Sequence, residues 1–418
     1  MSWMRSWTGS DDEGFGMDFL LDARVRTGGW ARVRGGRAAC GRLARMPLML
    51  PSSLESTRSI AGVAPQLLGA LRDAPGELPP VRSAVLVVVD GLGALPLRAH
   101  AGHARTLVSA MAKKDVAGSV FPTTTAAALT SLLTGSAPGV HGMVGYRVRH
   151  PERDVLVNQL TEWDGVDPTA WQPQATVFEQ AAAAGHPTFA VGIAAHAGTG
   201  LTHAILRGAE FRSAGSPADR VELAWELADA HDGALVYCYL PEADKAGHKH
   251  GVDSAEWVSA LEDIDAALSR RVPDGVGVLV TADHGMVDVP AHRQLILDAA
   301  GGWHDGIRHI GGEPRMLHVY TEPDADQPGI LSRWRRDLDG FADVVSRVEA
   351  IDAGLFGGMV TDAARERVGD LLVIARSNHA LYDGEAADQR GRGMVGQHGA
   401  LTMEEWRVPL IRMGAFSR

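Results

Sequence analysis

Cysteine is nearly absent from the 418-residue sequence, which contains only Cys40 and Cys238. Two cysteines provide neither a disulfide framework nor a zinc site built from thiolates. Any metal must therefore be bound by histidine and carboxylate side chains. Low cysteine usage also fits a reducing compartment, so we expect a cytoplasmic protein.

Long apolar runs and an excess of positive charge are also missing. The longest apolar runs, Ala84–Val89 and Val276–Ala282, are far shorter than the roughly 20 residues of a membrane-spanning helix. The formal net charge of −11 disfavours a general nucleic-acid-binding protein. With 45% apolar and 22% charged residues, the composition is that of a globular protein with a large core, and we expect neither a membrane nor a nucleic-acid partner. The oligomeric state is not indicated.

The first 45 residues differ from the rest of the chain. Seven arginines lie among glycines and alanines from Arg24 to Arg45, and no continuous apolar segment of a secretory signal follows a basic start. We predict a disordered extension over residues 1–45, before the more regular sequence that begins at Met46. The alternative is an arginine-rich arm that binds RNA or anionic lipid, but Trp30 is the single aromatic residue among these arginines and the rest of the chain is acidic.

Strand and helix patterns alternate along the body of the sequence. The run SAVLVVVDG (83–91) is typical of a parallel strand that is covered on both faces and ends in an acid. The alternation predicts an α/β fold with a doubly wound, mostly parallel sheet flanked by helices. Further strands are expected at 187–193, 234–240 and 276–282, and helices at 59–72, 175–185, 216–231 and 254–270.

The pattern changes after Val287. Residues 288–395 carry scattered glycine and proline, with strands expected at 316–320 and 370–375 and helices near 328–338 and 361–367. We predict a smaller inserted α+β subdomain, because the chain then returns to a short polar motif and a closing strand, WRVPLIRM. The catalytic α/β core would comprise 46–287 and 396–418, with 288–395 as a cap over the site.

Three consecutive threonines precede an Ala/Leu-rich helix that ends at Gly135. In the stretch VFPTTTAAALTSLLTG, Thr125 would lie where free backbone N–H groups and the helix dipole favour an anion such as phosphate. An ordinary helix N-cap is the alternative. Thr123 and Thr124 are expected to serve in capping or packing.

Histidines and aspartates that could bind a metal follow several predicted strands. Since the carboxyl ends of parallel strands meet at one edge of a sheet, these residues should come together near Thr125. They are Asp90 after 83–89, Asp244 and His248 in PEADKAGHKHG, Asp283 and His284 in TADHG, and His398 in VGQHG.

In this order, Asp90, FPTTT, D-x-x-x-H, ADHGM and GQHG resemble the type I phosphodiesterase/nucleotide pyrophosphatase family of the alkaline phosphatase superfamily. The resemblance extends from about residue 80 onward and implies an alkaline phosphatase-like fold. It also implies two zinc ions, one bound by Asp244, His248 and His398, and the other by Asp90, Asp283 and His284 and facing Thr125.

The resemblance implies that Thr125 is the nucleophile and becomes a phosphothreonine during hydrolysis of a phosphodiester or pyrophosphate bond. The substrate would be a small phosphorylated molecule, with a nucleotide as one candidate. In the family that the sequence resembles, the nucleophilic threonine is followed by Phe-Pro-Asn, and this asparagine helps to hold the phosphoryl oxygen. Residues 126–128 here are all alanine, so that donor is missing. Tyr146 and Arg147, or a donor from the inserted subdomain, are the candidates to replace it. A phosphomonoesterase or phosphonate hydrolase built on the same two metals is the alternative enzyme, and a non-catalytic binding protein of the same fold is a further alternative.

Overall fold

The apolar run that ends in Asp90 forms the middle strand of the largest sheet. The structure is a computed structural model that describes residues 58–74 and 76–417, so the prediction for residues 1–45 lies outside it. All seven residues of β1 (Ser83–Val89) are buried, and since side chains alternate between the faces of a strand, both faces of the sheet are covered here. The strand order is β2-β17-β8-β1-β7-β5-β6. The other strands are β2 (Val116–Gly118), β5 (Thr188–Gly192), β6 (Glu210–Ser213), β7 (Leu235–Leu240), β8 (Val276–Thr281) and β17 (Arg407–Gly414).

The sheet is parallel except for one strand. Strands β8, β1, β7, β5 and β6 pair in parallel, whereas β17 pairs antiparallel with both β8 and β2. The closing strand predicted near the end of the chain is therefore an interior strand that runs against its neighbours. These pairings confirm the predicted α/β fold with a mostly parallel sheet.

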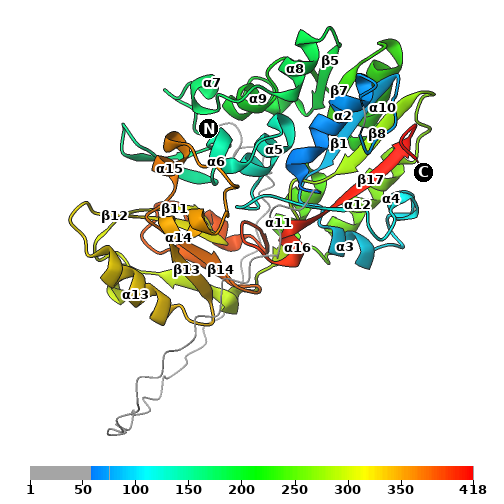
Figure 1. Ribbon diagram of the computed structural model, residues 1–418. Helices are drawn as coiled ribbons and strands as arrows, with labels where there is room; N and C mark the ends of the chain where they lie inside the picture. Colours follow the sequence, from blue (N-terminus) through cyan, green and yellow to red (C-terminus); the bar gives the residue numbers. More distant parts are fainter. Residues whose placement is uncertain (1–57, 75, 418) are drawn as a thin grey trace, which may run out of the picture. The chain divides into compact units, whose positions relative to one another are not determined.

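Helices flank this sheet, as Figure 1 shows. Helices α2 and α10 both pack against β1 and β7, and α8 packs against β5. Each long helix predicted from the sequence is present within a few residues of its expected ends. The helices up to β8 are α2 (Val63–Leu71), α3 (Ala94–Ala99), α4 (Arg105–Ala110), α5 (Thr125–Thr134), α6 (Pro138–His141), α7 (Pro168–Trp171), α8 (Val177–Ala183), α9 (Gly200–Ile205), α10 (Pro217–Ala230), α11 (Glu242–His250) and α12 (Ala255–Leu268).

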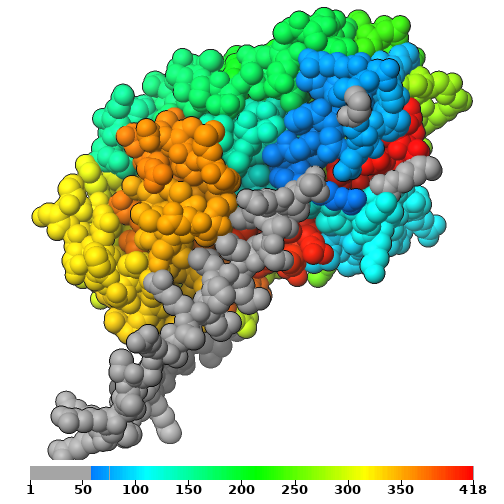
Figure 2. Space-filling model, in the orientation of Figure 1, coloured from blue at the N-terminus to red at the C-terminus, as the bar shows by residue number. Residues whose placement is uncertain are grey.

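The segment between β8 and β17 carries a sheet of its own. Four antiparallel strands pair in the order β11-β12-β14-β13. Apolar side chains of this segment pack in one cluster, which includes Val319, Trp334 and Val373. In the face shown in Figure 2, the orange surface around α15 adjoins the green surface of the residues that follow α6. We retain residues 288–395 as a proposed cap subdomain. Its main elements are β11 (Ile307–Glu313), β12 (Met316–Thr321), α13 (Gln327–Asp337), β13 (Ala342–Ser346), α14 (Arg347–Asp352), α15 (Asp362–Arg367) and β14 (Leu371–Ala375).

Three two-stranded sheets complete the fold. They are β3 (Arg147–His150) with β4 (Val155–Asn158), β9 (Val287–Asp288) with β16 (Gly396–Gln397), and β10 (Gln294–Leu297) with β15 (Ala380–Asp383). The pairing of β9 with β16 joins the two ends of the inserted segment.

An ion pair also joins the two parts of the chain. Arg315, in the turn after β11, makes a two-pronged contact of 3.1 and 2.7 Å with Glu405 in α16 (Met403–Trp406), and both side chains are fully buried. Among the described residues, no helix combines the length and apolar character needed to cross a membrane.

Candidate active site

The structure brings all seven predicted site residues to the carboxyl edge of the large sheet. Asp90 follows β1, Asp283 and His284 follow β8, and Asp244 and His248 lie on α11, directly after β7. Because β8, β1 and β7 are neighbours in the sheet, these residues converge. His398 joins them from the loop between β16 and β17, and Thr125 is the first residue of α5.

The distances show one continuous cluster. His284 Nε2 lies 3.1 Å from Thr125 Oγ1, 3.4 Å from Asp283 Oδ2 and 3.6 Å from Asp90 Oδ1. Its ring stacks on that of His398, with 3.7 Å between the ring centroids. The nucleophile candidate therefore lies directly beside an imidazole nitrogen, which itself lies close to two carboxylates.

The second part of the cluster is centred on α11. His248 Nε2 lies 3.3 Å from Asp244 Oδ1, one helical turn away, and the rings of His248 and His398 are 5.1 Å apart. The i, i+4 spacing places both side chains on one face of the helix. His398 thus lies between the two other histidines and links the two halves of the site.

Hydrogen bonds to the backbone fix the tautomers of the three histidines. In each ring Nδ1 contacts a carbonyl oxygen, which can only accept, so Nδ1 carries the proton and the lone pair of Nε2 is directed into the cluster. Metal-binding histidines in proteins commonly have their other nitrogen held in this way. The partners are the carbonyls of Gly396 for His248, Gly285 for His284 and Thr123 for His398, at 2.8, 3.0 and 2.8 Å.

Three buried carboxylate oxygens in the cluster have no hydrogen-bond partner among the described residues: Asp90 Oδ1, Asp244 Oδ1 and Asp283 Oδ2. Burial, together with the charge of Asp244, raises the pKa of both Asp90 and Asp283. Such a group of unpaired buried acids is costly unless a cation compensates it. Imidazole and carboxylate ligands without thiolate suit Zn²⁺, so the residues fit the predicted metal.

Two sets of three ligand atoms lie mutually within 4.8 Å: Asp244, His248 and His398, and Asp90, Asp244 and His284. The first set is the same as the first predicted zinc site. The second contains Asp244 where Asp283 was predicted. Asp283 nevertheless offers its unpaired Oδ2, since its Oδ1 accepts from the backbone N–H groups of Gly91 and His284 at 3.2 and 2.9 Å.

The first turn of α5 is free to bind an anion. Thr124 is the N-cap residue, yet its side chain makes no capping hydrogen bond, so the ordinary N-cap interpretation does not apply. The first intrahelical bond runs from the N–H of Ala128 to the carbonyl of Thr124, which leaves the backbone N–H groups of residues 125–127 for another acceptor. Gly135 ends the helix in the left-handed conformation, as expected.

Two residues support the site in ways that the sequence did not predict. The hydroxyl of Tyr239 on β7 donates a hydrogen bond to Asp90 Oδ2, which leaves Oδ1 as the unpaired oxygen. The side chain of Thr123 donates to Ala400 O at 2.8 Å and accepts from Gly399 N at 3.0 Å, so it holds the loop that carries His398. Tyr239 lies near the end of β7, the strand beside β1. This position is the one sequence feature that could have indicated its role.

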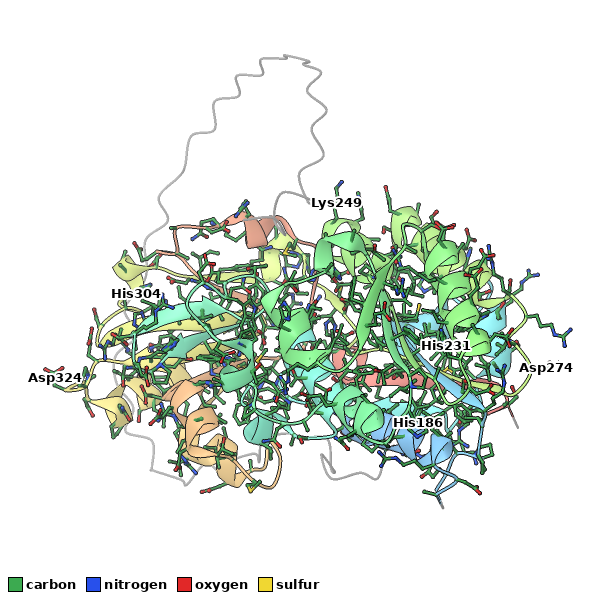
Figure 3. The ribbon with its side chains drawn as sticks, turned by 90° about the horizontal axis from the view of Figure 1, so that it is seen from above. His186, His231, Lys249, Asp274, His304 and Asp324 are labelled. Carbon is green, nitrogen blue, oxygen red and sulfur yellow. The ribbon has the colours of Figure 1, made fainter. Side chains whose placement is uncertain are left out.

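Several other histidine, lysine and tryptophan residues have structural or peripheral positions. Buried His141 contacts Ser131 at 2.8 Å through Nε2 and accepts from the N–H of Met143 through Nδ1. Lys249 is exposed and lies at the edge of the molecule in Figure 3. Trp303 packs on the apolar cluster of the inserted segment, with its ring perpendicular to that of Trp334.

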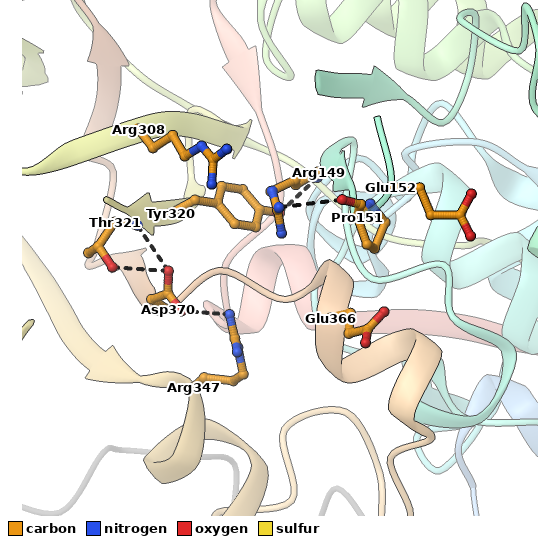
Figure 4. Close-up of a pocket in the computed structure, with 9 residues that line it drawn as sticks. All are labelled: Arg149, Pro151, Glu152, Arg308, Tyr320, Thr321, Arg347, Glu366 and Asp370. Atoms are coloured by element: carbon orange, nitrogen blue, oxygen red, sulfur yellow. Dashed lines mark hydrogen bonds and ion pairs between the residues drawn. The ribbon is translucent and has the colours of Figure 1, made fainter. Parts of the chain in front are cut away.

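A polar cavity of about 620 Å³ lies elsewhere, between the β3–β4 hairpin and the inserted segment. Figure 4 shows Arg149, Arg308 and Arg347 in its wall, with Arg347 paired to Asp370 at 2.7 Å. Arg149 and Arg308 are both paired with the carboxylate of Asp154. None of the seven predicted site residues lines this cavity, so it is distinct from the metal-ligand cluster.

A mostly parallel sheet with a His/Asp cluster at its carboxyl edge is the architecture of the alkaline phosphatase superfamily. Within it, the chain belongs to the type I phosphodiesterase/nucleotide pyrophosphatase family, whose model matches residues 84–401. This membership confirms the predicted family and indicates a hydrolase of phosphoester or phosphonate bonds.

Solved structures share the fold. The chain is 21% identical to phosphonoacetate hydrolase from Sinorhizobium meliloti 1021 in complex with phosphonoacetate, with a TM-score of 0.61 over 80% of this chain and 91% of that one. It is 18% identical to an inactive threonine-to-alanine variant of murine ectonucleotide pyrophosphatase/phosphodiesterase 5 in complex with AMP, with a TM-score of 0.60 over 80% and 88% of the chains.

Proposed function

We propose that the protein is a two-zinc hydrolase of phosphodiester or pyrophosphate bonds that acts through a phosphothreonine intermediate on Thr125. One observation carries the proposal: the Thr125 hydroxyl lies 3.1 Å from His284 Nε2, within a cluster of unpaired carboxylates and imidazole lone pairs. The inactivity of the murine neighbour's threonine-to-alanine variant supports a threonine nucleophile in this fold.

The ligand sets are part of the proposal. Asp244, His248 and His398 would hold one zinc ion, and Asp90, Asp283 and His284, together with Thr125, the other. Bound there, the two ions would supply Lewis acidity that makes a hydroxyl nucleophilic at neutral pH and neutralises charge on the reacting phosphoryl group.

The residues of the chain would then perform two displacements. Thr125 Oγ1 forms a bond to phosphorus as the bond to the leaving oxygen breaks, and the leaving group departs as an alcohol or phosphate after taking up a proton. The backbone N–H groups at the start of α5 bind the phosphoryl oxygens during this step. In the second step a water molecule attacks phosphorus, the Thr125 ester bond breaks, and the threonine hydroxyl regains its proton.

The substrate class rests on the family and the neighbours. A small phosphorylated molecule, with a nucleotide as one candidate, agrees with the AMP bound to the murine neighbour. A phosphonate hydrolase on the same metals is favoured by the phosphonoacetate bound to the Sinorhizobium protein, and a phosphomonoesterase remains the third enzymatic candidate. The complete set of seven residues argues against a non-catalytic binding protein. We also propose a cytoplasmic location, for which low cysteine usage is the support.

The test combines metal analysis with parallel assays. The purified protein is expected to contain about two zinc ions per chain and to hydrolyse bis-p-nitrophenyl phosphate faster than p-nitrophenyl phosphate or phosphonoacetate. Faster turnover of the monoester would favour a phosphomonoesterase instead, and faster turnover of the phosphonate would favour a phosphonate hydrolase. A zinc-loaded protein that is inactive on all three and on a dinucleoside diphosphate would contradict it.

A further inference from the structure

The buried carboxylate of Glu405 contacts three parts of the chain. Glu405 lies in α16, between His398 and β17 in the sequence, and its side chain is fully buried. Its Oε2 accepts from the backbone N–H and the hydroxyl of Thr402 at 3.4 and 2.7 Å, and its Oε1 accepts from the N–H of Ala400 at 2.9 Å. Both oxygens also accept from Arg315, at 3.1 and 2.7 Å. The carboxylate therefore joins the inserted segment to the loop that carries His398.

This loop is held from two sides. The N–H of Ala400 donates to Glu405, while its carbonyl accepts from the Thr123 hydroxyl at 2.8 Å. The N–H of Gly399 donates to the same hydroxyl at 3.0 Å. Because peptide units are planar and only two dihedral angles per residue are free, contacts one and two residues after His398 restrict where its ring can lie. Thr123 and Glu405 thus clamp the loop between α5 and α16.

The backbone of Glu405 reaches the turn of a second metal-ligand candidate. Its carbonyl accepts from the N–H of Gly285 at 2.8 Å, and Gly285 directly follows His284. An added Cβ at Gly285 would lie 1.9 Å from the carbonyl oxygen of Glu404, so α16 packs against this turn with no room for a side chain. The rings of His284 and His398 stack at 3.7 Å. One residue therefore contacts the backbone beside both stacked histidines.

Arg315 orients the Glu405 carboxylate. Both side chains are fully buried, and Arg315 Nη1 also donates to the carbonyl of His379. A buried ion pair adds little net stability, since the lost hydration of two charges offsets their attraction, and an apolar pair of similar volume often serves the fold as well. The planar fork of a guanidinium does fix the plane of a carboxylate. In this structure it fixes the oxygen that accepts from Ala400.

We propose that Glu405 is a positioning residue for the metal centre, which holds the backbone beside His284 and His398 so that both rings keep their places, and that Arg315 couples this arrangement to the inserted segment. This inference rests on the proposed function, because it assumes the two zinc sites. It assigns a role to two residues that neither bind metal nor touch the substrate. Zinc affinity should therefore depend on a hydrogen bond to Ala400.

Two double variants that differ only at position 405 test this dependence. Arg315→Met with Glu405→Gln keeps an oxygen for the N–H of Ala400, whereas Arg315→Met with Glu405→Met keeps none. Both remove the ion pair without leaving one buried charge alone. We expect the Glu405→Met double variant to bind zinc about 10- to 100-fold more weakly than wild type in competition with a chelator, and the Glu405→Gln double variant to stay within about threefold.

Arg347→Met is a control for the loss of an ion pair as such. Arg347 pairs with Asp370 at 2.7 Å within the inserted segment and makes no contact with the His398 loop. Its zinc affinity should equal that of wild type. A loss as large as in the Glu405→Met double variant would overturn the inference.

Equal zinc affinities in the two double variants would also overturn this inference and leave the proposed function standing, since that function is judged on the wild-type protein. A wild-type protein that binds zinc but hydrolyses no phosphoester or phosphonate would contradict the proposed function, while the zinc affinities still decide the role of Glu405. A wild-type protein that binds no zinc would overturn both.

If the Glu405→Met double variant does not fold, Glu405→Asp carries the test. Aspartate keeps the charge that pairs with Arg315, but its side chain is one methylene shorter, so the contact with the N–H of Ala400 is lost. Zinc binding should then weaken about 10-fold. Wild-type zinc affinity in Glu405→Asp would contradict the inference.

Discussion

The imidazole of His398 donates a hydrogen bond of 2.8 Å from Nδ1 to the backbone carbonyl of Thr123. This contact joins the loop of a metal-ligand candidate to the residue two positions before the nucleophile candidate. It fixes the tautomer of the ring and, through the backbone, the start of α5. The nucleophile and one metal ligand are therefore positioned together rather than independently.

Replacement of Thr125 is the most direct test of the nucleophile. Thr125→Ala should fold and bind metal, since Thr125 is one ligand among several, but turnover should fall by several orders of magnitude. Thr125→Ser should keep part of the activity, because the hydroxyl remains while the methyl group that restricts its rotamer is lost. Mass spectrometry after an acid quench should place the phosphoryl or phosphoester group on the peptide that contains Thr125.

The neighbouring threonines provide unequal controls for this experiment. Thr124 makes no side-chain cap, so Thr124→Ala should leave turnover near wild type. Thr123→Ala removes the hydroxyl that holds Gly399 and Ala400 and should reduce activity through the His398 loop. Wild-type turnover in Thr125→Ala, or label on Thr123, would show that the nucleophile is assigned wrongly.

Removal of metal should affect both activity and stability. Chelation is expected to abolish hydrolysis and to lower the unfolding temperature, because an ion that binds only the folded state stabilises it. Adding back zinc should restore both, as followed by differential scanning calorimetry and the diester assay. An active preparation that contains no metal would exclude the proposed mechanism.

Loss of the Tyr239 hydroxyl should weaken metal binding without disturbing the fold. The hydroxyl holds Asp90 Oδ2, and loss of such an outer hydrogen bond typically costs 10- to 100-fold in metal affinity. Competition with a zinc chelator measures the change in Tyr239→Phe. Tyr237→Phe is the matched control, since Tyr237 lies two residues earlier on the same face of β7 and stacks on Tyr239. Equal zinc affinities in the two variants would refute the role of Tyr239.

His318 should make the protein sensitive to acid. Its Nδ1 accepts from Gly369 N and its Nε2 donates to Val144 O, and burial lowers its pKa from 6.5 to about 4. Because the folded pKa is below the unfolded value, the stabilisation is complete above pH 6.5 and is lost as the pH falls from 6.5 towards 4. The loss is roughly 3 kcal/mol at most.

His318→Gln isolates this contribution, since glutamine can both donate and accept but does not titrate in this range. Urea unfolding between pH 4 and 7 should give a shallower pH dependence for the variant than for wild type. Parallel curves would show that His318 is not the titrating group.

The central strands of the large sheet could be predicted from the sequence alone. The apolar runs at 83–91, 234–240 and 276–282 correspond to β1, β7 and β8 within two residues, because continuous Val/Leu runs of this length have few alternatives to a buried strand. Asp90, Asp244 and Asp283 come together because each follows one of these adjacent strands. A placement that depends only on strand order and direction can be derived from the order of motifs along the chain.

Features that depend on contacts between distant segments were not accessible in this way. The antiparallel placement of β17 is set by pairs such as Leu410 with Thr281, which no local pattern encodes. The hydrogen bond from Tyr239 to Asp90 depends on the reach of one side chain from β7 to the end of the adjacent strand β1. The buried contact of Arg315 with Glu405 joins segments that are 90 residues apart.

The position of β17 also constrains when the protein becomes active during its synthesis. The strand lies inside the sheet between β2 and β8, and it follows His398 in the chain. A ribosome that has translated β8 has already made four proposed site residues, Asp90, Thr125, Asp244 and His248, and the β8 residue Thr281, which later pairs with β17. At this stage β2 still has no partner strand beside it. The sheet closes, and the His398 loop is anchored from both sides, only after residues 407–414 have emerged. Nascent chains shorter than this should therefore be catalytically silent, and a premature stop just before β17 should abolish activity even though every proposed metal ligand has been translated.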